Sequence, residues 1–136
     1  MSQENVEIVR RIYESLTRGD DAWRDVVAPE LVVDFSRRLV DPFVARGRDD
    51  EVLASFQRET LEVWEELPTW EPKELIDAGD KVFAFIRTSG TGKASGALVE
   101  ARVANVWTFR DGKPVEFTYF GEDRAAALEA AGLRGS

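Results

Sequence analysis

The stretches IDAGDKV at residues 76–82 and NVWTFRDGKPV at residues 105–115 decide the fold of this chain of 136 residues. In each stretch a tight polar turn separates two runs that read as β-strands, and the Asp-Gly pair of the second is the stronger hairpin signal. Together they predict an antiparallel meander of four strands, at about residues 70–77, 81–89, 98–110 and 115–120.

The residues before this meander have helical spacing instead. Val6, Val9, Tyr13 and Leu16 form one apolar stripe, and Gly19 ends the helix that carries it. The same criteria predict a short helix at about residues 21–27, a longer one from residue 49 or 50 to 67, and a last one at about 123–132. A short apolar strand is predicted at residues 31–35.

Residues 37–49 are polar and contain Pro42 and Gly47, so we interpret them as a loop. A loop of this length is unusual in a compact domain. Long loops are often lids or rims of binding pockets.

The composition fits a single domain over residues 1–136, since 43% of the residues are hydrophobic. The chain has no His and no Cys, which excludes disulfides, thiolate chemistry, Ser-His-Asp triads and zinc sites built on imidazole or thiolate. No carboxylate cluster has a spacing that suits a divalent ion. We therefore expect neither a metal nor another cofactor.

The formal net charge of −8 argues against nucleic acid or an anionic membrane as a partner, because phosphate binding needs a basic surface. No apolar run approaches the roughly 18 residues that span a bilayer. Residues 1–15 form an acid-containing amphipathic segment unlike a signal peptide. We expect a soluble, cytoplasmic protein.

Several motifs are spread over the whole chain: NVEIVRRIYE at 5–14, RGD at 18–20, DFSR at 34–37, LIDAGD at 75–80, VWTFRDGK at 106–113 and ALEAAGL at 127–133. Through them the chain resembles the nuclear transport factor 2-like (NTF2-like) superfamily, and most closely its SnoaL-like branch. The resemblance implies an α+β fold in which a cone-shaped, curved antiparallel sheet wraps around three N-terminal helices, with a short C-terminal helix. Isomerases, hydrolases, cyclases and binding proteins share this scaffold, so fold alone does not identify the function.

Asn105 is the first candidate site residue. Alternation along residues 99–109 points the odd positions inward, so Asn105 is a polar residue on an apolar face with Val103 and Trp107. Ketosteroid isomerases, which look similar here, place a protonated Asp at this point, and an amide can also donate a hydrogen bond to an oxyanion. The alternative is that Asn105 binds a neighbouring loop or carbonyl of the scaffold.

Tyr13 is a second possible donor, on the core face of the first helix. The resemblance places the isomerase-type tyrosine at Ile12, however, about 100° around the helix. This favours Tyr13 as a core residue whose hydroxyl finds a hydrogen-bond partner.

A general base is harder to assign. The resemblance places it at Phe35 or Asp34, and alternation turns Phe35 inward, so Asp34 faces the pocket only if the strand is twisted or bulged. The alternative role of Asp34 is to cap the chain or to pair with Arg37 or Arg38. Limonene epoxide hydrolases resemble a different solution, an Arg-x-Asp pair, but the matching residues here are Val-Ala-Asn at 103–105.

Two further carboxylates follow the last strand, where SnoaL-type cyclases carry an acid-base group. Asp123 is favoured as the N-cap of the last helix, which leaves Glu122 as the freer carboxylate. Gly90 to Lys93 resemble a phosphate loop only superficially and are better interpreted as a flexible hairpin tip. The predicted pocket is lined by inward or core-facing side chains: Tyr13, Phe35, Phe56, Trp64, Val103, Trp107 and Tyr119.

Three hypotheses about function follow. The first is a protein that binds a small hydrophobic molecule without converting it. The second is a cofactor-independent isomerase or cyclase acting on a carbonyl-containing substrate, with Asn105 as donor and Asp34 or Glu122 as base. The third is a partner-binding domain with a vestigial pocket.

We also expect a homodimer through the outer face of the sheet. The reason is an apolar patch predicted from Val106 and Phe120, or from Phe83 and Phe85.

Overall fold

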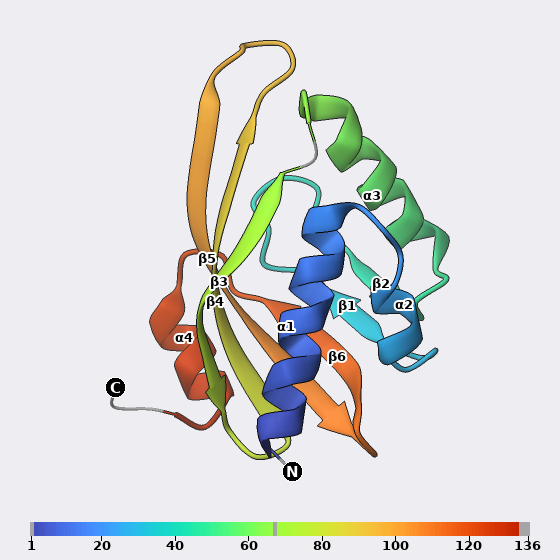
Figure 1. The fold of residues 1–136 in the computed structure, drawn as a ribbon, viewed down its shortest axis with the longest axis vertical. Helices are drawn as coiled ribbons and strands as arrows, with labels where there is room; N and C mark the ends of the chain where they lie inside the picture. Colours follow the sequence, from blue (N-terminus) through green and yellow to red (C-terminus); the bar gives the residue numbers. More distant parts are fainter. Residues whose placement is uncertain (1, 67, 134–136) are drawn as a thin grey trace.

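A computed structural model describes residues 2–66 and 68–133 and shows an α+β arrangement (Figure 1). Its elements are α1 (Ser2–Arg18), α2 (Trp23–Val26), β1 (Val32–Asp34), β2 (Val44–Arg46), α3 (Glu51–Val63), β3 (Thr69–Asp77), β4 (Lys81–Thr91), β5 (Leu98–Arg110), β6 (Lys113–Tyr119) and α4 (Arg124–Ala130).

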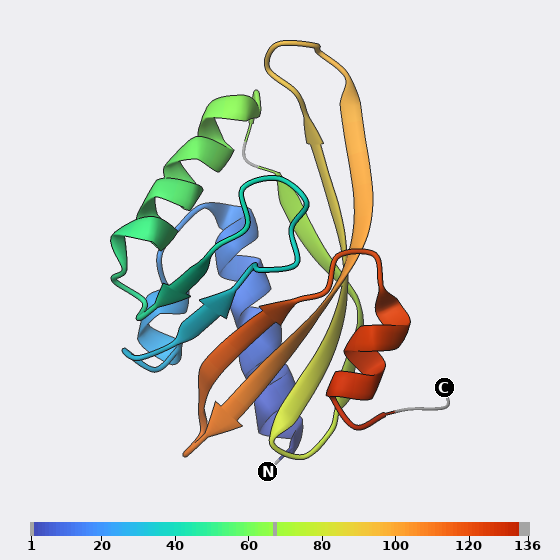
Figure 2. The same ribbon diagram turned by 180° about the vertical axis from the view of Figure 1, so that it is seen from behind.

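The strands form one six-stranded sheet in the order β2-β1-β6-β5-β4-β3. The predicted meander is confirmed as β3 to β6, in which each strand pairs antiparallel with the next. β1 joins the meander by pairing parallel with β6. Helices α1 and α4 lie on opposite faces of the sheet (Figures 1 and 2). We call the face that packs against α1 the inner face and the face under α4 the outer face.

Strand alternation divides the apolar residues between the two faces. On β4, Val82, Ala84 and Ile86 pack with α1 on the inner face, whereas Phe83 lies with Phe85 on the outer face. On β5, Trp107 and Phe109 face inward, as the period of two predicts. The inner face therefore carries the larger core.

The apolar patch from which a dimer was predicted is buried within the chain. Phe83, Val106 and Phe120 do not form an exposed patch, because Ala127 and Leu128 of α4 pack over them. Phe83 is 0% exposed. The short helix α4 thus covers this part of the sheet within the same chain.

The segment 37–49 is not one continuous loop. Val44–Arg46 form β2, which pairs with β1 and places Ala45 in the core. The connection between β1 and β2 covers residues 35–43, and it lies between α3 and the end of β6 (Figure 2).

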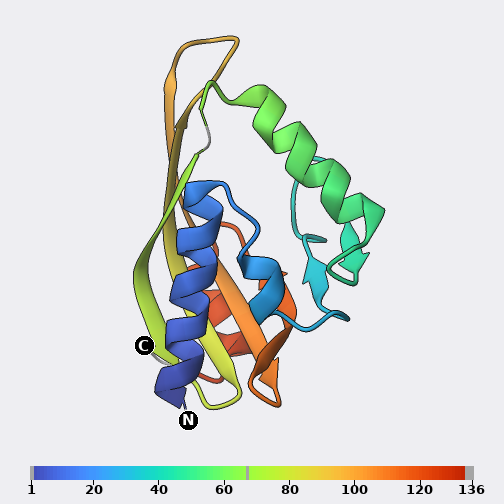
Figure 3. The same ribbon diagram turned by 45° about the vertical axis from the view of Figure 1, so that its right-hand side comes forward.

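Helix α3 is shorter at its C-terminal end than the predicted helix, which extended to residue 67. The helix ends at Val63, before Trp64, which forms a β-bridge with Gly92, while Leu67 lies outside the described residues. The backbone N of Glu65 donates to the carbonyl of Thr91 at 2.8 Å, and Lys93 donates to Val63 at 2.9 Å. These bonds tie the end of α3 to the β4–β5 hairpin (Figure 3).

Candidate functional site

A polar cluster of three side chains lies between α1 and the inner face of the sheet. The hydroxyl oxygen of Tyr13 accepts hydrogen bonds from Nδ2 of Asn105 at 2.8 Å and from Nε1 of Trp107 at 3.0 Å. The rings of Tyr13 and Trp107 meet edge to face, with centroids 5.9 Å apart. All three side chains are buried, with Asn105 only 4% exposed.

Only part of this cluster could be predicted from the sequence. Alternation predicts that Asn105 and Trp107 share a face, and helical spacing predicts that Tyr13 is buried. The contact between them joins residues more than ninety positions apart in the sequence. No local pattern reports such a contact.

Hydrogen bonding within the cluster is incomplete. Oδ1 of Asn105 is buried and has no partner among the described residues. The Tyr13 hydroxyl has one hydrogen to donate, and among the described residues only bonds that its oxygen accepts are found. Turning the Asn105 amide by half a turn would let Tyr13 donate to Oδ1, but Nδ2 would then lose its acceptor. In either orientation the cluster lacks a partner, which a ligand atom or a water molecule can supply.

Tyr13 keeps its proton over the whole physiological range. Burial raises the pKa of the phenol well above its ordinary value, and the hydrogen bonds from Trp107 and Asn105 only partly offset this effect. The hydroxyl is therefore a neutral group that both accepts and donates hydrogen bonds.

A continuous series of aromatic rings leads from this cluster to partly exposed positions near α3; we call it the aromatic path. Trp107 contacts Phe117 with centroids 4.8 Å apart, and Phe117 contacts Phe35 at 5.3 Å. Phe35 in turn contacts three further rings, with centroids 5.0–5.1 Å apart: Phe43, Phe56 and Tyr119.

The aromatic path includes several predicted pocket residues. Phe35, Phe56 and Tyr119 are partly buried and pack on the inner core, as does Val103. Tyr119 is the direct cross-strand partner of Asn105. Sequence reasoning did not assign Phe43 and Phe117 to the pocket, although Phe117 alternates with Tyr119 and could have been included.

Trp64 lies apart from this path, at the end of α3. Its ring covers Gly90, where an added Cβ would lie 2.9 Å from Cε3 of the indole. Trp64 therefore closes the contact between α3 and the β4–β5 hairpin.

The structure does not bring the two candidate bases to the polar cluster. Asp34 is next to inward-facing Val33 and pairs with Thr118, and its Oδ1 accepts from the backbone N of Ser36 at 2.8 Å. This is the capping role given as the alternative for Asp34. No carboxylate in residues 2–66 or 68–133 is found hydrogen-bonded to Tyr13, Asn105 or Trp107.

The carboxylates after β6 are also accounted for elsewhere. Oδ1 of Asp123 accepts from the backbone N of Ala126 at 3.0 Å, which confirms it as the N-cap of α4. Glu122 is exposed and lines an open hollow of about 370 Å³ with Phe85 and Arg102. This hollow belongs to the β4–β5 side of the molecule, not to the polar cluster.

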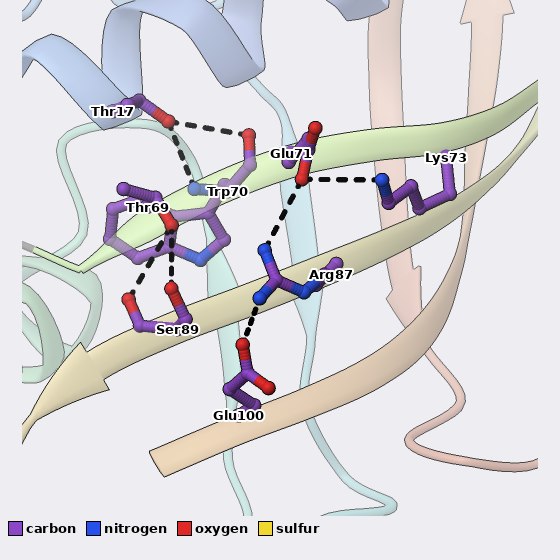
Figure 4. A network of polar contacts seen from close by, with 8 residues as sticks. All are labelled: Thr17, Thr69, Trp70, Glu71, Lys73, Arg87, Ser89 and Glu100. Atoms are coloured by element: carbon purple, nitrogen blue, oxygen red, sulfur yellow. Dashed lines mark hydrogen bonds and ion pairs between the residues drawn. The ribbon is translucent and has the colours of Figure 1, made fainter. Parts of the chain in front are cut away.

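A network of charged side chains crosses β3, β4 and β5 (Figure 4). Arg87 on β4 bridges Glu71 on β3, 3.4 Å away, and Glu100 on β5, and Lys73 also contacts Glu71. These groups are partly exposed, so the pairs contribute little to stability one by one. Their alternation of sign nevertheless gives this side of the sheet a polar character.

The described residues contain no group of three or more His, Cys, Asp or Glu side chains that could hold a metal ion. Within the same residues, no helix is long and apolar enough to cross a membrane.

Comparison with known proteins identifies the family. The SnoaL-like domain matches residues 9–117, so the chain belongs to the SnoaL-like domain family. An NTF2-like protein from Burkholderia thailandensis E264 is 30% identical, with a TM-score of 0.75 and coverage of 95% of each chain.

Two more distant structures share the fold. A candidate SnoaL-like polyketide cyclase from Jannaschia sp. CCS1 is 22% identical, with a TM-score of 0.72 and coverage of 93% of this chain and 91% of its own. TerC, co-crystallised with polyporic acid, is 19% identical, with a TM-score of 0.73 and coverage of 95% and 98%. A search of curated protein sequences gives no significant match.

Proposed function

We propose that the protein binds a small hydrophobic molecule against the aromatic path, with one polar atom of the molecule held by the cluster of Tyr13, Asn105 and Trp107. The observation that carries this proposal is the buried Oδ1 of Asn105, which has no partner in the described part of the chain. Leaving a buried polar atom unpaired costs about 1–3 kcal/mol, so native proteins seldom retain one without a reason. A hydroxyl group of a bound molecule could donate to Oδ1 of Asn105. In the turned orientation of the amide, a carbonyl oxygen of the molecule could accept from Nδ2 instead.

Binding without conversion is favoured over catalysis because a base is missing beside the donors. General base catalysis needs a group within hydrogen-bond reach of the proton that it removes, or one water away. Asp34 caps Ser36 and Glu122 lies by the exposed hollow, so neither supports that role.

The alternative is a cofactor-independent isomerase or cyclase acting on a carbonyl-containing substrate. The observation in its favour is that the neutral Tyr13 hydroxyl and the Asn105 amide could together bind a developing oxyanion. Under this alternative the substrate itself or a bound water would have to take part in the proton transfer.

Replacement of Asn105 by Leu tests the proposal. Within residues 2–66 and 68–133, the only hydrogen bond found for the Asn105 side chain is to Tyr13, and no backbone group there loses a partner. The Tyr13 oxygen keeps its bond from Trp107. We therefore expect the free energy of unfolding to change by less than about 1 kcal/mol, and the affinity for a carbonyl-bearing apolar dye such as Nile red to fall roughly tenfold.

Asn5→Leu in α1 is the matched control, since Asn5 is the only other asparagine and has no hydrogen bond among the described side chains. Native mass spectrometry of both variants and the wild type adds a direct search for a co-purified molecule. A clear fall in melting temperature of Asn105→Leu with unchanged dye affinity would assign Asn105 to the scaffold and contradict the proposal.

A further inference from the structure

The connection between β1 and β2 carries two apolar side chains at its tip that no other part of the described structure covers. Leu39 is 101% exposed and Val40 is 67% exposed. Single exposed apolar residues are common on protein surfaces and need no explanation by themselves. This pair, however, lies in a loop whose two ends belong to the aromatic path.

Both ends of the loop are rings of the aromatic path. The backbone N of Phe35 donates to the carbonyl of Phe43 at 2.9 Å, and their rings lie 5.1 Å apart. Each ring also contacts Phe56 of α3, at 5.0 and 5.1 Å. The tip is therefore joined on both sides, within a few residues, to the proposed binding surface.

Two arginines fix the first part of the loop across the space between α3 and β6. The guanidinium carbon of Arg37 lies 4.2 Å from the ring centre of Phe120, just after β6, and that of Arg38 lies 5.1 Å from the ring centre of Phe56 in α3. Such cation–π contacts favour one position of the loop without burying its tip. Figure 2 shows the loop lying between these two elements.

The chain turns back sharply after the tip. Asp41 has a φ of 50°, in the left-handed region that few non-glycine residues adopt. This turn presents Leu39 and Val40 together at the end of the hairpin while Phe43 returns to the aromatic path.

We propose that residues 36–42 form a lid, and that Leu39 and Val40 become direct contacts of the hydrophobic molecule when it binds. This inference rests on the proposed function. A molecule held against partly buried rings keeps apolar surface exposed on its outer side, and covering that surface together with the two aliphatic side chains removes both from water. Leu39 and Val40 then determine which apolar shapes bind tightly.

The first experiment compares two leucines in the same substitution. Leu39→Ser lies at the lid tip, and Leu98→Ser lies on the β4–β5 hairpin, where Leu98 is 68% exposed. We expect Nile red affinity to fall roughly fivefold to tenfold for Leu39→Ser and to stay unchanged for Leu98→Ser. The melting temperatures of both should equal that of the wild type, because neither side chain is packed.

The second experiment observes closure directly and uses the absence of cysteine from the chain. In Leu39→Cys and Leu98→Cys the introduced thiol is the only one, and its rate of reaction with Ellman's reagent reports its exposure. Saturation with Nile red should slow the reaction at position 39 several-fold and leave position 98 unaffected.

The outcomes separate this inference from the function on which it rests. Saturable binding of Nile red by the wild type, with equal affinities for the two serine variants and no protection at position 39, would overturn the lid alone. Failure of the wild type to bind Nile red saturably would overturn the pocket and the lid together.

Discussion

Asp20 uses both carboxylate oxygens at the corner where α1 ends. Its Oδ1 accepts from Oγ of Ser15 at 2.5 Å and from the backbone N of Ala22 at 3.0 Å, and its Oδ2 accepts from Nε of Arg18 at 2.7 Å. The hydrogen bond from Ser15, followed by those from Arg18 and Ala22, lowers the pKa of Asp20 from 3.8 to about 2. The Arg-Gly-Asp motif at this position therefore has a structural role.

The lowered pKa gives a pH dependence with a definite sign. A carboxylate whose pKa is depressed by folding stabilises the folded state fully above its unfolded pKa, and the contribution disappears as the pH falls through the folded pKa. We expect the stability difference between the wild type and Asp20→Asn to shrink as the pH falls from about 4 to about 2. Urea unfolding at several pH values measures it.

Asp21→Asn is the control, because no hydrogen bond is found for the Asp21 side chain in the described structure. Backbone hydrogen bonds from Arg46 and Val52 also lower the pKa of Asp50, so the stability of every variant falls with pH for this second reason. Asp50 is present in the wild type and in both variants, and its effect therefore cancels when their stabilities are compared. A pH-independent difference for Asp20→Asn would contradict the assignment.

Individual site residues were predictable to different degrees. The direction of Asn105 follows from strand alternation alone, which is a local property of the backbone. The partner of Tyr13 and the capping role of Asp34 depend on how a helix and a loop meet the sheet. Sequence patterns therefore place Asn105 on the correct face and leave the chemistry around it open.

At the scale of elements, β3 is an edge strand whose exposed backbone is blocked. Oγ1 of Thr17 in α1 accepts from the backbone N of Trp70 at 2.9 Å and donates to its carbonyl at 3.3 Å (Figure 4). Two residues further on, Pro72 has no N–H to offer to another strand. An edge that keeps free backbone groups can pair with a second chain and aggregate.

Replacing Thr17 by Val, which has nearly the same shape, removes both hydrogen bonds. We expect a loss of about 1–3 kcal/mol in the free energy of unfolding, since two partly buried backbone groups lose their partner, and faster aggregation on heating. Chemical unfolding and light scattering measure the two effects.

Thr118→Val on β6 serves for comparison, because β6 is paired on both sides and the described residues offer no hydrogen bond to the Thr118 side chain. Equal stability of the two variants would show that Thr17 does not protect the edge.

Strands joined by a recognisable turn motif could be predicted from the sequence, whereas β2 could not. The meander was predictable because its Ala-Gly and Asp-Gly turns join strands that are neighbours in sequence. β2 was missed because it has only three residues and lies within a polar stretch between Pro42 and Gly47. A strand so short has no readable alternation and depends on β1 for its pairing.

For the whole molecule, we retain the homodimer as a proposal on different grounds. The part of the sheet beyond α4 carries Arg87 between Glu71 and Glu100, next to the hollow lined by Phe85 and Arg102. A surface with both signs of charge can be complementary to a second copy of itself about a two-fold axis.

Light scattering at micromolar concentration should then give twice the chain mass of 15.3 kDa. Arg87→Glu places three acidic groups together and should favour the monomer, while Arg110→Glu, at the β5–β6 turn, should leave the mass unchanged. A monomer mass for the wild type would contradict the proposal.

The parallel pairing of β1 with β6 has a consequence for how the chain reaches its structure. Val33 lies opposite Phe117, so a strand from the first third of the chain finds its place only beside one of the last elements. Contacts of such large sequence separation slow folding, because a long loop must close before they form. During synthesis from the N-terminus, β1 and β2 emerge before β6, so Phe35 lacks its ring contacts with Phe117 and Tyr119 until β6 has been made. The first half of this protein is thus a candidate client of cellular chaperones, whereas the β3–β5 meander can assemble as soon as it leaves the ribosome.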